Sequence, residues 1–480
     1  MKFKKNNFFL LAGIILFVGL FFYYILPPID PDLGWHLRYG QYIFQNHQIM
    51  RVNQITFLLP HYYWRQSYSF YQLTLFLIYH WIGFWGIAFA GALVTTAIFW
   101  PFIFSKKMIN DAPLTVLLMI FFTAPVASLG YRSQLFSLMG CSWLYWYLTR
   151  DKPSRGKHLF FFFLAFVFWA NLHGGFILGL ILLAIAGMES FWQKNLARAK
   201  FLSSALLVSF LATLINPFGL GVYREVIRHS WYPLNKLIAE WTPPGKIYVT
   251  ALIFFFILIT VLLSIRLLLK NNASKSTRLQ RKHIFFLTFS WLFFAFLSLK
   301  ARRHLPFFGL ASIYWLFFIS PLSFPKRWIR WGIVPLSLGL VLIRITNWPK
   351  IDRHWHFICQ SRVSQPCPAV EFLKEKPHLC HYLYNTYEWG GFLAWQLPRT
   401  KTFVDGRMPA WPTPEKKSPY SIYLEILQTR PGFNQRLEKY RADCLLIGRG
   451  TFLDLELKKS QKYPWQAVYE DKQAVIYRHK

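Results

Sequence analysis

The stretch FFLLAGIILFVGLFFYYILPPIDPDLGWHLRYG, residues 8–40, contains the features that decide the fold. Its first part, residues 8–26, is an uninterrupted apolar run that is long enough to cross a bilayer as a helix. Two prolines end that helix. Asp30 and Asp32 follow almost at once, although acidic residues are scarce in this chain. The first question is therefore what two carboxylates do at the point where a membrane helix ends.

Similar apolar runs recur along the first 346 residues. Together with a content of 54% hydrophobic and 20% aromatic residues, they are typical of a polytopic membrane protein. We expect an all-α membrane domain of about eleven transmembrane helices, residues 1–346, followed by a small soluble α/β domain, residues 347–480. The expected spans are 8–26, 85–104, 114–129, 134–149, 157–171, 174–192, 200–215, 249–268, 284–299, 306–321 and 329–346.

The chain is strongly basic, with a formal net charge of +34 from 54 Lys and Arg against 20 Asp and Glu. No nucleic-acid-binding motif accompanies this charge, so we expect no nucleic acid as a partner. Basic residues in the loops of a membrane protein instead set its orientation and contact anionic lipids. The basic start precedes an apolar run without a small-residue cleavage site, which predicts an uncleaved first span.

The distribution of basic residues over the predicted loops gives the orientation. With a cytoplasmic N-terminus and with 68–81 taken as an interfacial helix, the inner loops hold 21 Lys and Arg and the outer loops hold 11. This asymmetry follows the positive-inside rule. We therefore expect a multi-pass protein of the plasma (inner) membrane. Its large first external loop, 27–84, and its C-terminal domain would lie outside the cytoplasm.

The C-terminal domain has its own composition, with 13 of the 20 acids and no run of spanning length. We expect a strand at 381–385, a helix over EWGGFLAWQL, a strand over KTFVDGR, and later strands within DCLLIG and QAVIYR. Disulfides can form if this domain is extracytoplasmic, but spacing does not give their pairing. The cysteines concerned are Cys359, Cys367, Cys380 and Cys444.

Of the acids in the first 346 residues, the predicted orientation leaves Asp30, Asp32, Glu225 and Glu240 outside. Pro31 favours an extended conformation for Asp30, and residues i and i+2 of an extended chain point to the same side. Both carboxylates can then face one ligand. The alternative is that Asp32 caps the amphipathic helix that follows. Because of this competing role of Asp32, we expect Asp30 to be the better candidate for catalysis or metal contact.

Further polar residues on the predicted outer face form a candidate substrate-binding set. Arginine suits phosphate because its planar fork bonds two oxygens. The alternatives are snorkelling for arginines at span ends, a tight turn around the Gly-Gly pair beside His173, and an Asp–Arg pair that only holds a turn in DGR. The set comprises His36, Arg38, Arg132, Asn171, His173, Glu240, Arg302, Arg303, His304, Trp389, Asp405 and Arg407.

These residue types favour chemistry on a phosphate. A carboxylate can act as a general base towards a hydroxyl, or can help to hold a divalent metal such as Mg²⁺ or Mn²⁺ that neutralises a phosphate leaving group. We therefore expect Asp30 and Asp32 as catalytic residues, and as the ligands of a metal if one is used. The matching substrate is a lipid-linked phosphate whose head group lies at the outer interface.

Several motifs resemble a group of poorly characterised bacterial integral membrane proteins. DPDLGWHL, ANLHGGF, NPFG, AEW, YEWGGFL and DGR are similar to that group's DPDLWWHL, ANLHGGF, NPYG, EW, YxWGGYL and DGR, over nearly the whole chain. The group resembles, more distantly, the GT-C glycosyltransferases, which include oligosaccharyltransferase catalytic subunits and protein O-mannosyltransferases. The chain departs from the group at Gly34, where Trp is usual, at Tyr68, where an acid is usual, and at Ser133, where Pro is usual.

The resemblance implies a polytopic enzyme that uses a polyprenyl-phosphate-linked sugar donor, with Asp30 and Asp32 matching the acidic motif of its first external loop. We expect a membrane glycosyltransferase that acts on an unknown acceptor at the outer face. Two other classes of protein remain. A transporter or flippase for a lipid-linked substrate predicts charges buried within spans and an internal repeat. A non-catalytic scaffold with a partner-binding C-terminal domain predicts that Asp30 is dispensable.

Overall fold

The computed structural model describes residues 5–104, 112–150, 156–232, 238–268, 283–319, 326–352, 355–359, 365–460 and 462–480. The chain divides into two compact units. Met1–Leu26, Ala88–Gly219 and Ile238–Pro349 form one, here called the helical unit. Pro27–Ile87, Leu220–Leu237 and Lys350–Lys480 form the other, here called the mixed unit.

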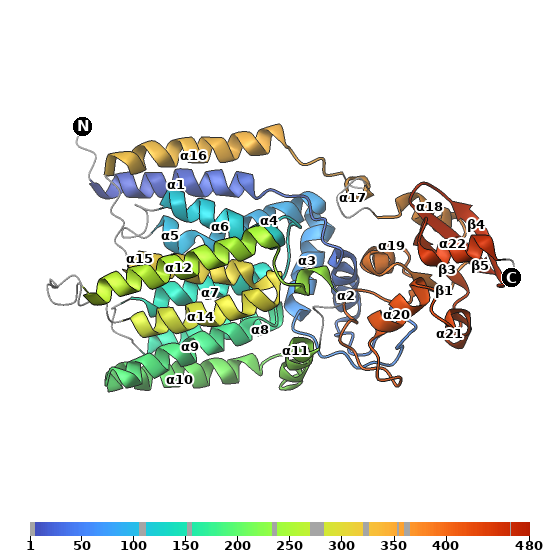
Figure 1. Cartoon of the computed structure of the whole chain (residues 1–480), viewed down its shortest axis with the longest axis horizontal. Coiled ribbons are helices and arrows are strands. Elements are labelled where there is room, and N and C mark those ends of the chain that lie inside the picture. Colours follow the sequence, from blue (N-terminus) through green and yellow to red (C-terminus); the bar gives the residue numbers. More distant parts are fainter. Residues whose placement is uncertain are drawn as a thin grey trace. The chain divides into compact units, whose positions relative to one another are not determined.

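The helical unit consists of helices that run side by side (Figure 1). Each of the eleven predicted apolar runs coincides with a helix, the second of them with two, so the helical prediction for this part of the chain is confirmed. The helices are α1 (Lys5–Tyr23), α4 (Phe84–Ile98), α5 (Trp100–Ile103), α6 (Ala112–Ala127), α7 (Gln134–Leu148), α8 (Lys157–Leu172), α9 (Phe176–Trp192), α10 (Leu196–Thr213), α12 (Lys246–Leu268), α14 (Ile284–Lys300), α15 (Leu305–Ile319) and α16 (Lys326–Thr346), with the short 3-10 helices η3 (Ala239–Trp241) and η5 (Arg302–His304).

Large apolar side chains cover the exterior of the helical unit. Phe161 on α8 and Phe254 on α12, for example, expose more than half of their surface. Soluble proteins rarely expose contiguous apolar surface on this scale, so this exterior suits lipid. Among the described residues, the helical stretches Leu196–Thr213 and Ala239–Leu262 are long and apolar enough to cross a bilayer by themselves, and the other apolar helices are shorter. The number of eleven transmembrane helices therefore stays a prediction.

Two buried charges in the helical unit stabilise helix ends. The Glu189 carboxylate accepts one hydrogen bond from the Phe286 N–H (2.9 Å) and lies 3.2 Å from His283 Nδ1, at the start of α14. The Arg344 guanidinium donates to the Tyr23 carbonyl at the end of α1, at 3.0 and 2.7 Å. Helix ends leave backbone groups unpaired and attract charge of the opposite sign. Both side chains thus have a structural explanation.

The mixed unit contains a sheet of five strands in the described part of the chain, in the order β2-β1-β3-β5-β4. β1 runs parallel to β2 and β3, and β5 runs antiparallel to β3 and β4. The strands are β1 (Tyr382–Asn385), β2 (Lys401–Thr402), β3 (Cys444–Gly448), β4 (Trp465–Glu470) and β5 (Ala474–His479). The predicted α/β domain is therefore present, although the second strand is shorter than expected and β4 was not expected.

Short helices complete the mixed unit. They are α2 (Leu33–Asn46), α3 (Ser69–Ile82), α11 (Gly221–Trp231), α17 (His356–Cys359), α18 (Cys367–Glu375), η6 (Tyr387–Trp389), α19 (Gly390–Gln396), α20 (Pro419–Leu427), α21 (Phe433–Lys439) and α22 (Phe452–Lys459). Disulfides join Cys359 to Cys367 and Cys380 to Cys444. The second of these links the starts of β1 and β3, a pairing that the spacing of the cysteines did not give.

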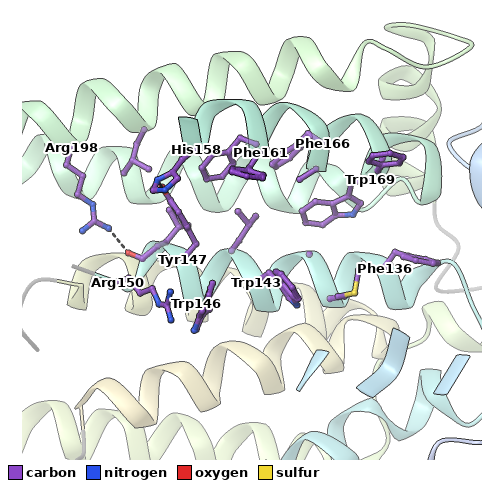
Figure 2. Close-up of a pocket in the computed structure, with 18 of the residues that line it drawn as sticks. Phe136, Trp143, Trp146, Tyr147, Arg150, His158, Phe161, Phe166, Trp169 and Arg198 are labelled. Atoms are coloured by element: carbon purple, nitrogen blue, oxygen red, sulfur yellow. Dashed lines mark hydrogen bonds between the residues drawn. The ribbon is translucent and has the colours of Figure 1, made fainter. Parts of the chain in front are cut away.

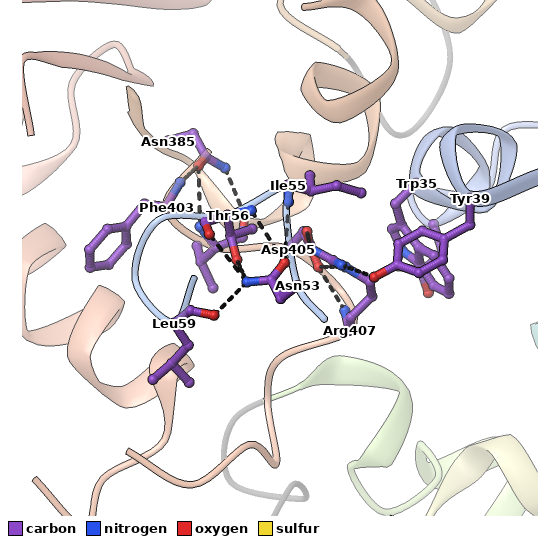
Figure 3. A network of polar contacts seen from close by, with 12 residues as sticks. Trp35, Tyr39, Asn53, Ile55, Thr56, Leu59, Asn385, Phe403, Asp405 and Arg407 are labelled. Atoms are coloured by element: carbon purple, nitrogen blue, oxygen red, sulfur yellow. Dashed lines mark hydrogen bonds and ion pairs between the residues drawn. The ribbon is translucent and has the colours of Figure 1, made fainter. Parts of the chain in front are cut away.

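Within the mixed unit, the first external loop packs with the C-terminal segment. Ile55 and Phe57 exchange backbone hydrogen bonds with Thr402 of β2, at 3.1 and 3.0 Å. The buried Asn53 amide holds this loop segment, donating to Thr56 Oγ1 (2.7 Å) and to the Leu59 carbonyl (2.7 Å) (Figure 3). The loop thereby adds an extended segment to the edge of the sheet.

A close backbone approach joins α2 to α19. A Cβ atom on Gly34 would lie 2.0 Å from the Gly391 carbonyl oxygen, and one on Gly391 would lie 2.2 Å from the Pro31 carbonyl oxygen. Only glycine fits at such distances. A larger side chain at position 34 would separate the two segments.

Gly34→Ala should destabilise the mixed unit by about 1–3 kcal/mol, because the added methyl forces the two backbones apart. Gly245→Ala is the control, since a Cβ there meets open space. Thermal unfolding of the purified protein measures both. Equal melting temperatures for the two variants and the parent would contradict the close approach.

Candidate functional site

The acidic stretch after α1 forms a turn and not the extended segment that the sequence predicted. The Leu33 N–H donates to the Asp30 carbonyl (3.0 Å), which places Pro31 at the second position of a β-turn, where its fixed φ is favoured. The Asp32 N–H donates to Asp30 Oδ1 (3.3 Å), as in an Asx-turn. Asp30 is buried, with 8% of its surface exposed. The Asp30 side chain therefore supports the local backbone of this turn.

Asp32 occupies the N-cap position of α2, but its side chain makes no capping hydrogen bond to the described backbone of that helix. Its Oδ1 instead accepts from the indole N–H of Trp35 at 2.8 Å. The same oxygen lies against Gly406, where a Cβ would come within 1.8 Å of it. The capping interpretation of Asp32 is thus wrong, because the indole one turn further along holds the carboxylate. The reason for ranking Asp30 above Asp32 no longer applies.

The other candidates on α2 have local partners. The His36 ring is buried, with its centroid 3.5 Å from that of Trp35 and 5.3 Å from that of Tyr68. Tyr68 is thus part of an aromatic cluster around this histidine, together with Trp35 and Tyr71. Arg38 is half-buried and donates to Gln41 Oε1 at 3.0 Å.

The DGR segment contains a fully buried ion pair. Asp405 accepts from Arg407 Nε (2.8 Å) and Nη2 (2.6 Å), and Arg407 Nη1 donates to the Tyr39 hydroxyl of α2 (2.6 Å) (Figure 3). The rings of Trp64 and Trp411 also surround the guanidinium, at 5.7 and 5.4 Å. Burial opposes the charge, yet the Asp405 carboxylate raises the pKa of Arg407 above its usual value. This geometry supports the alternative in which the pair holds a turn, and it ties α2 to the sheet.

Asn385, which the sequence analysis did not single out, positions the DGR segment. Its side-chain Oδ1 accepts from the Phe403 N–H at 2.8 Å and its Nδ2 donates to the Val404 carbonyl at 3.0 Å. Trp389 is buried at the start of α19. Gly390 follows, and a Cβ there would lie 2.2 Å from the Val404 carbonyl oxygen. The sequence feature that could have indicated this role is a single Asn at the end of a predicted strand, shortly before a Gly-Gly pair.

The helical unit gathers basic residues at the ends of several helices. Glu240 in η3 lies 3.1 Å from Arg132 Nη1 and 3.8 Å from Arg303 Nη1. The Arg303 guanidinium also lies over the Trp241 ring, 4.3 Å from its centroid. Burial opposes ionisation of Glu240, but Arg132 and Arg303 outweigh it and lower the pKa of Glu240 to about 2. We call Arg132, Glu240, Arg302 and Arg303 the arginine cluster; its three guanidinium groups exceed its one carboxylate by two charges.

Backbone contacts fix the segments that carry the arginine cluster. The Gln134 amide of α7 donates to the Arg303 carbonyl at 2.7 Å, and the Arg302 N–H donates to the Thr242 carbonyl at 2.9 Å. Asn171, another predicted candidate, donates to the Val167 and Ile215 carbonyls, both at 2.8 Å. The amide of Asn171 thus joins the end of α8 to the chain after α10.

His173 is a neutral residue beside the arginine cluster. Its Nδ1 accepts from the Gly175 N–H (3.0 Å) and lies 2.7 Å from Ser137 Oγ, so its proton is on Nε2. Trp169 Nε1 in turn donates to Ser137 Oγ at 2.8 Å. Burial and then the charges of Arg303 and Arg132 lower the pKa of His173 to about 3. Burial and Arg303 likewise lower the pKa of His304 to about 3.

The described ranges contain no group of three or more His, Cys, Asp or Glu side chains arranged to hold a metal ion. Asp30 and Asp32 could supply at most two carboxylate ligands. Mg²⁺ often binds through one or two carboxylates together with substrate phosphates and water. A metal at the acidic pair would therefore need further ligands from a substrate phosphate and water.

Comparisons with known proteins show the fold. No family model matches the sequence, and no curated protein matches it. Two crystal structures of ArnT from Cupriavidus metallidurans are similar, one bound to undecaprenyl phosphate (13% identity, TM-score 0.50) and one in the apo state (12%, 0.51), each covering 98% of this chain and 97% of that chain. The chain has a GT-C-like fold.

A second similar protein supports the same conclusion. It is the archaeal oligosaccharyltransferase AglB from Archaeoglobus fulgidus, in complex with an inhibitory peptide and a dolichol-phosphate. Its identity is 11% and its TM-score 0.52, and the match covers 93% of this chain and 70% of that chain. The GT-C resemblance drawn from the DPDLGWHL, ANLHGGF and DGR motifs is thus confirmed at the level of the fold.

The low pKa of His173 predicts that acid destabilises the protein. Below about pH 6.5 the unfolded state takes up a proton that the folded state refuses until about pH 3. The free energy of unfolding should therefore fall as the pH drops through this window, by up to about 1.4 kcal/mol per pH unit. His173→Asn keeps an acceptor near the Nδ1 position but does not titrate, so its stability should vary less with pH in thermal melts.

His47→Asn is the matched control, because His47 is exposed at the end of α2. It should keep the parental pH dependence. A His173→Asn variant whose melting temperature follows the parental curve from pH 7 to pH 4 would contradict a buried neutral His173.

Proposed function

We propose that the protein is a membrane glycosyltransferase that moves a sugar from a polyprenyl-phosphate-linked donor to an acceptor at the outer face of the membrane. The observation that carries this proposal is the arginine cluster on a GT-C-like helical unit. The similar proteins ArnT and AglB are bound to undecaprenyl phosphate and to dolichol-phosphate, which are lipids of the same chemical kind.

The arginine cluster is suited to hold a lipid phosphate. Guanidinium groups bond phosphate oxygens in pairs, and partial burial strengthens the attraction by lowering the local dielectric. Glu240 orients Arg132 and Arg303 and leaves an excess of positive charge for the ligand. The arginines would bind the phosphate of the donor and stabilise the charge that develops on it as the sugar leaves.

The carboxylates of the acidic turn would serve the acceptor. A carboxylate close to a hydroxyl or amide removes its proton as the acceptor attacks the sugar carbon that leaves the phosphate. Asp32 is half-buried and held at Oδ1 by the Trp35 indole, which orients the carboxylate. Arg407, through Tyr39 on the same helix, is a positioning residue for this arrangement.

A divalent metal remains part of this proposal, with Asp30 and Asp32 as its protein ligands. When bound with the donor, Mg²⁺ or Mn²⁺ would neutralise charge on the leaving phosphate. Loss of sugar transfer in EDTA, with recovery on adding either metal, supports this role. Full transfer in EDTA contradicts it.

The outer location of the mixed unit is also a proposal, and the disulfides support it. Disulfides persist outside the reducing cytoplasm, and this unit holds the Cys359–Cys367 and Cys380–Cys444 bonds. Against the transporter class, the buried charges Glu189 and Arg344 already serve helix ends and need no transported ion to explain them.

The amide variants of the acidic turn test the enzyme proposal. Asp30→Asn keeps an acceptor for the Asp32 N–H, and Asp32→Asn keeps one for the Trp35 indole, so both should melt as the parent does. Each should lower sugar transfer by about 100-fold or more, as expected for loss of a general base. Because Asp32 does not cap α2, its variant should lose as much as the Asp30 variant.

Glu371→Gln is the control for these two variants, since it removes an exposed carboxylate of the same unit. It should keep parental transfer. Full transfer by both amide variants, with unchanged melting, would leave the scaffold class as the better explanation.

Retention of lipid tests the phosphate role. Arg302→Gln, alone and together with Arg303→Gln, should reduce the polyprenyl phosphate that co-purifies with the protein, as measured by mass spectrometry of extracted lipids. The single variant leaves the Arg303–Glu240 and Arg132–Glu240 contacts in place. Lys246→Gln removes an exposed charge near η3 and should not reduce retention. If the double variant retains as much polyprenyl phosphate as the parent, both arginines are better explained by snorkelling.

A further inference from the structure

A second feature of the helical unit is an elongated groove between α7, α8 and α10. Its volume is about 870 Å³, near the upper end of the range for ligand pockets. Most of its wall is apolar, and Trp143 on α7 and Phe161 and Phe166 on α8 are among the residues that line it (Figure 2). Such a lining suits a hydrocarbon chain.

The polar groups of the groove gather at one end. Figure 2 shows Arg150, His158 and Arg198 together at that end, with Phe136 and Trp169 at the other. Among the described residues that line the groove, none is acidic. The groove therefore pairs a long apolar wall with one cationic end.

Local contacts hold these basic side chains in place. The Arg150 guanidinium lies 3.3 Å from the centroid of the Trp146 ring. Arg198 Nη2 donates to the Leu148 carbonyl in the last turn of α7, at 2.5 Å. His158 Nδ1 and the Tyr147 hydroxyl are hydrogen-bonded at 2.9 Å. The cationic end is thus ordered by aromatic and backbone contacts before any ligand arrives.

We propose that this groove binds an anionic phospholipid, with the phosphate at Arg150 and Arg198 and an acyl chain along the aromatic wall. Arginine bonds phosphate oxygens, and Trp and Tyr are favoured at the level of lipid head groups. α7 has 15 residues and is about 22 Å long. That exceeds the thickness of one leaflet, about 15 Å, so an acyl chain can lie along it.

The position of the charge distinguishes this ligand from the donor of the proposed glycosyltransferase. Arg132 of the arginine cluster precedes α7, whereas Arg150 follows it. A phosphate at each place would therefore lie at opposite ends of the same helix. The groove would hold a lipid of the other leaflet, and this inference does not depend on the proposed function.

Native mass spectrometry of the delipidated full-length protein tests the proposal. We expect phosphatidylglycerol to bind more tightly than zwitterionic phosphatidylethanolamine. Each basic residue near a lipid head group contributes about fivefold in affinity, so Arg150→Gln with Arg198→Gln should weaken phosphatidylglycerol binding more than tenfold. Lys200→Gln, an exposed basic residue of α10 outside the groove, is the control and should bind as the parent does.

A second variant tests the apolar wall. Ala165→Trp adds bulk within the groove at an exposed position of α8 and should reduce phosphatidylglycerol binding without changing the melting temperature. Equal binding of the two phospholipids by the parent, or unchanged phosphatidylglycerol binding in either groove variant, would overturn the proposal. Displacement of phosphatidylglycerol from the groove by equimolar polyprenyl phosphate would also overturn it, since the groove would then belong to the donor.

Discussion

The mixed unit depends on the buried Asp405–Arg407 pair. A charge pair removed from water is stable only where its geometry is good and further hydrogen bonds satisfy the remaining donors. Here the Asp405 carboxylate accepts hydrogen bonds from two guanidinium nitrogens of Arg407, and the Tyr39 hydroxyl accepts one from the third. Because Tyr39 lies on α2, the pair fixes the helix whose first turn follows Asp32. The acidic turn therefore depends for its position on a segment that lies far along the chain.

The titratable residues around the arginine cluster differ in protonation state. Glu240 remains ionised between Arg132 and Arg303, whereas His173 is kept neutral by burial and by the same arginines. Positive charge thus stays in excess at the arginine cluster. Trp169 connects this region to the apolar groove, since its ring lines the groove while its N–H donates to Ser137, which contacts His173. This arrangement is compatible with a phosphate ligand at the arginine cluster and a lipid chain in the groove.

The sequence predicted the helices of the membrane part and the strands β1, β3 and β5, because long apolar runs and short β-rich runs are local signals. It also named Arg132, Glu240 and Arg303 in one candidate binding set, and these three side chains lie together in the helical unit.

Contacts between distant segments had no local signal. The sequence did not reveal the approach of Gly34 to Gly391, the indole that replaces the helix cap at Asp32, or the buried amide of Asn385. Whether the protein is an enzyme can be decided from the sugar–phosphate bond of a polyprenyl-phosphate-linked sugar in proteoliposomes that also contain membrane acceptors. We expect the protein to break this bond, so that free polyprenyl phosphate accumulates and is detected by mass spectrometry of the lipids. A donor that stays intact while it moves between leaflets would contradict the glycosyltransferase proposal.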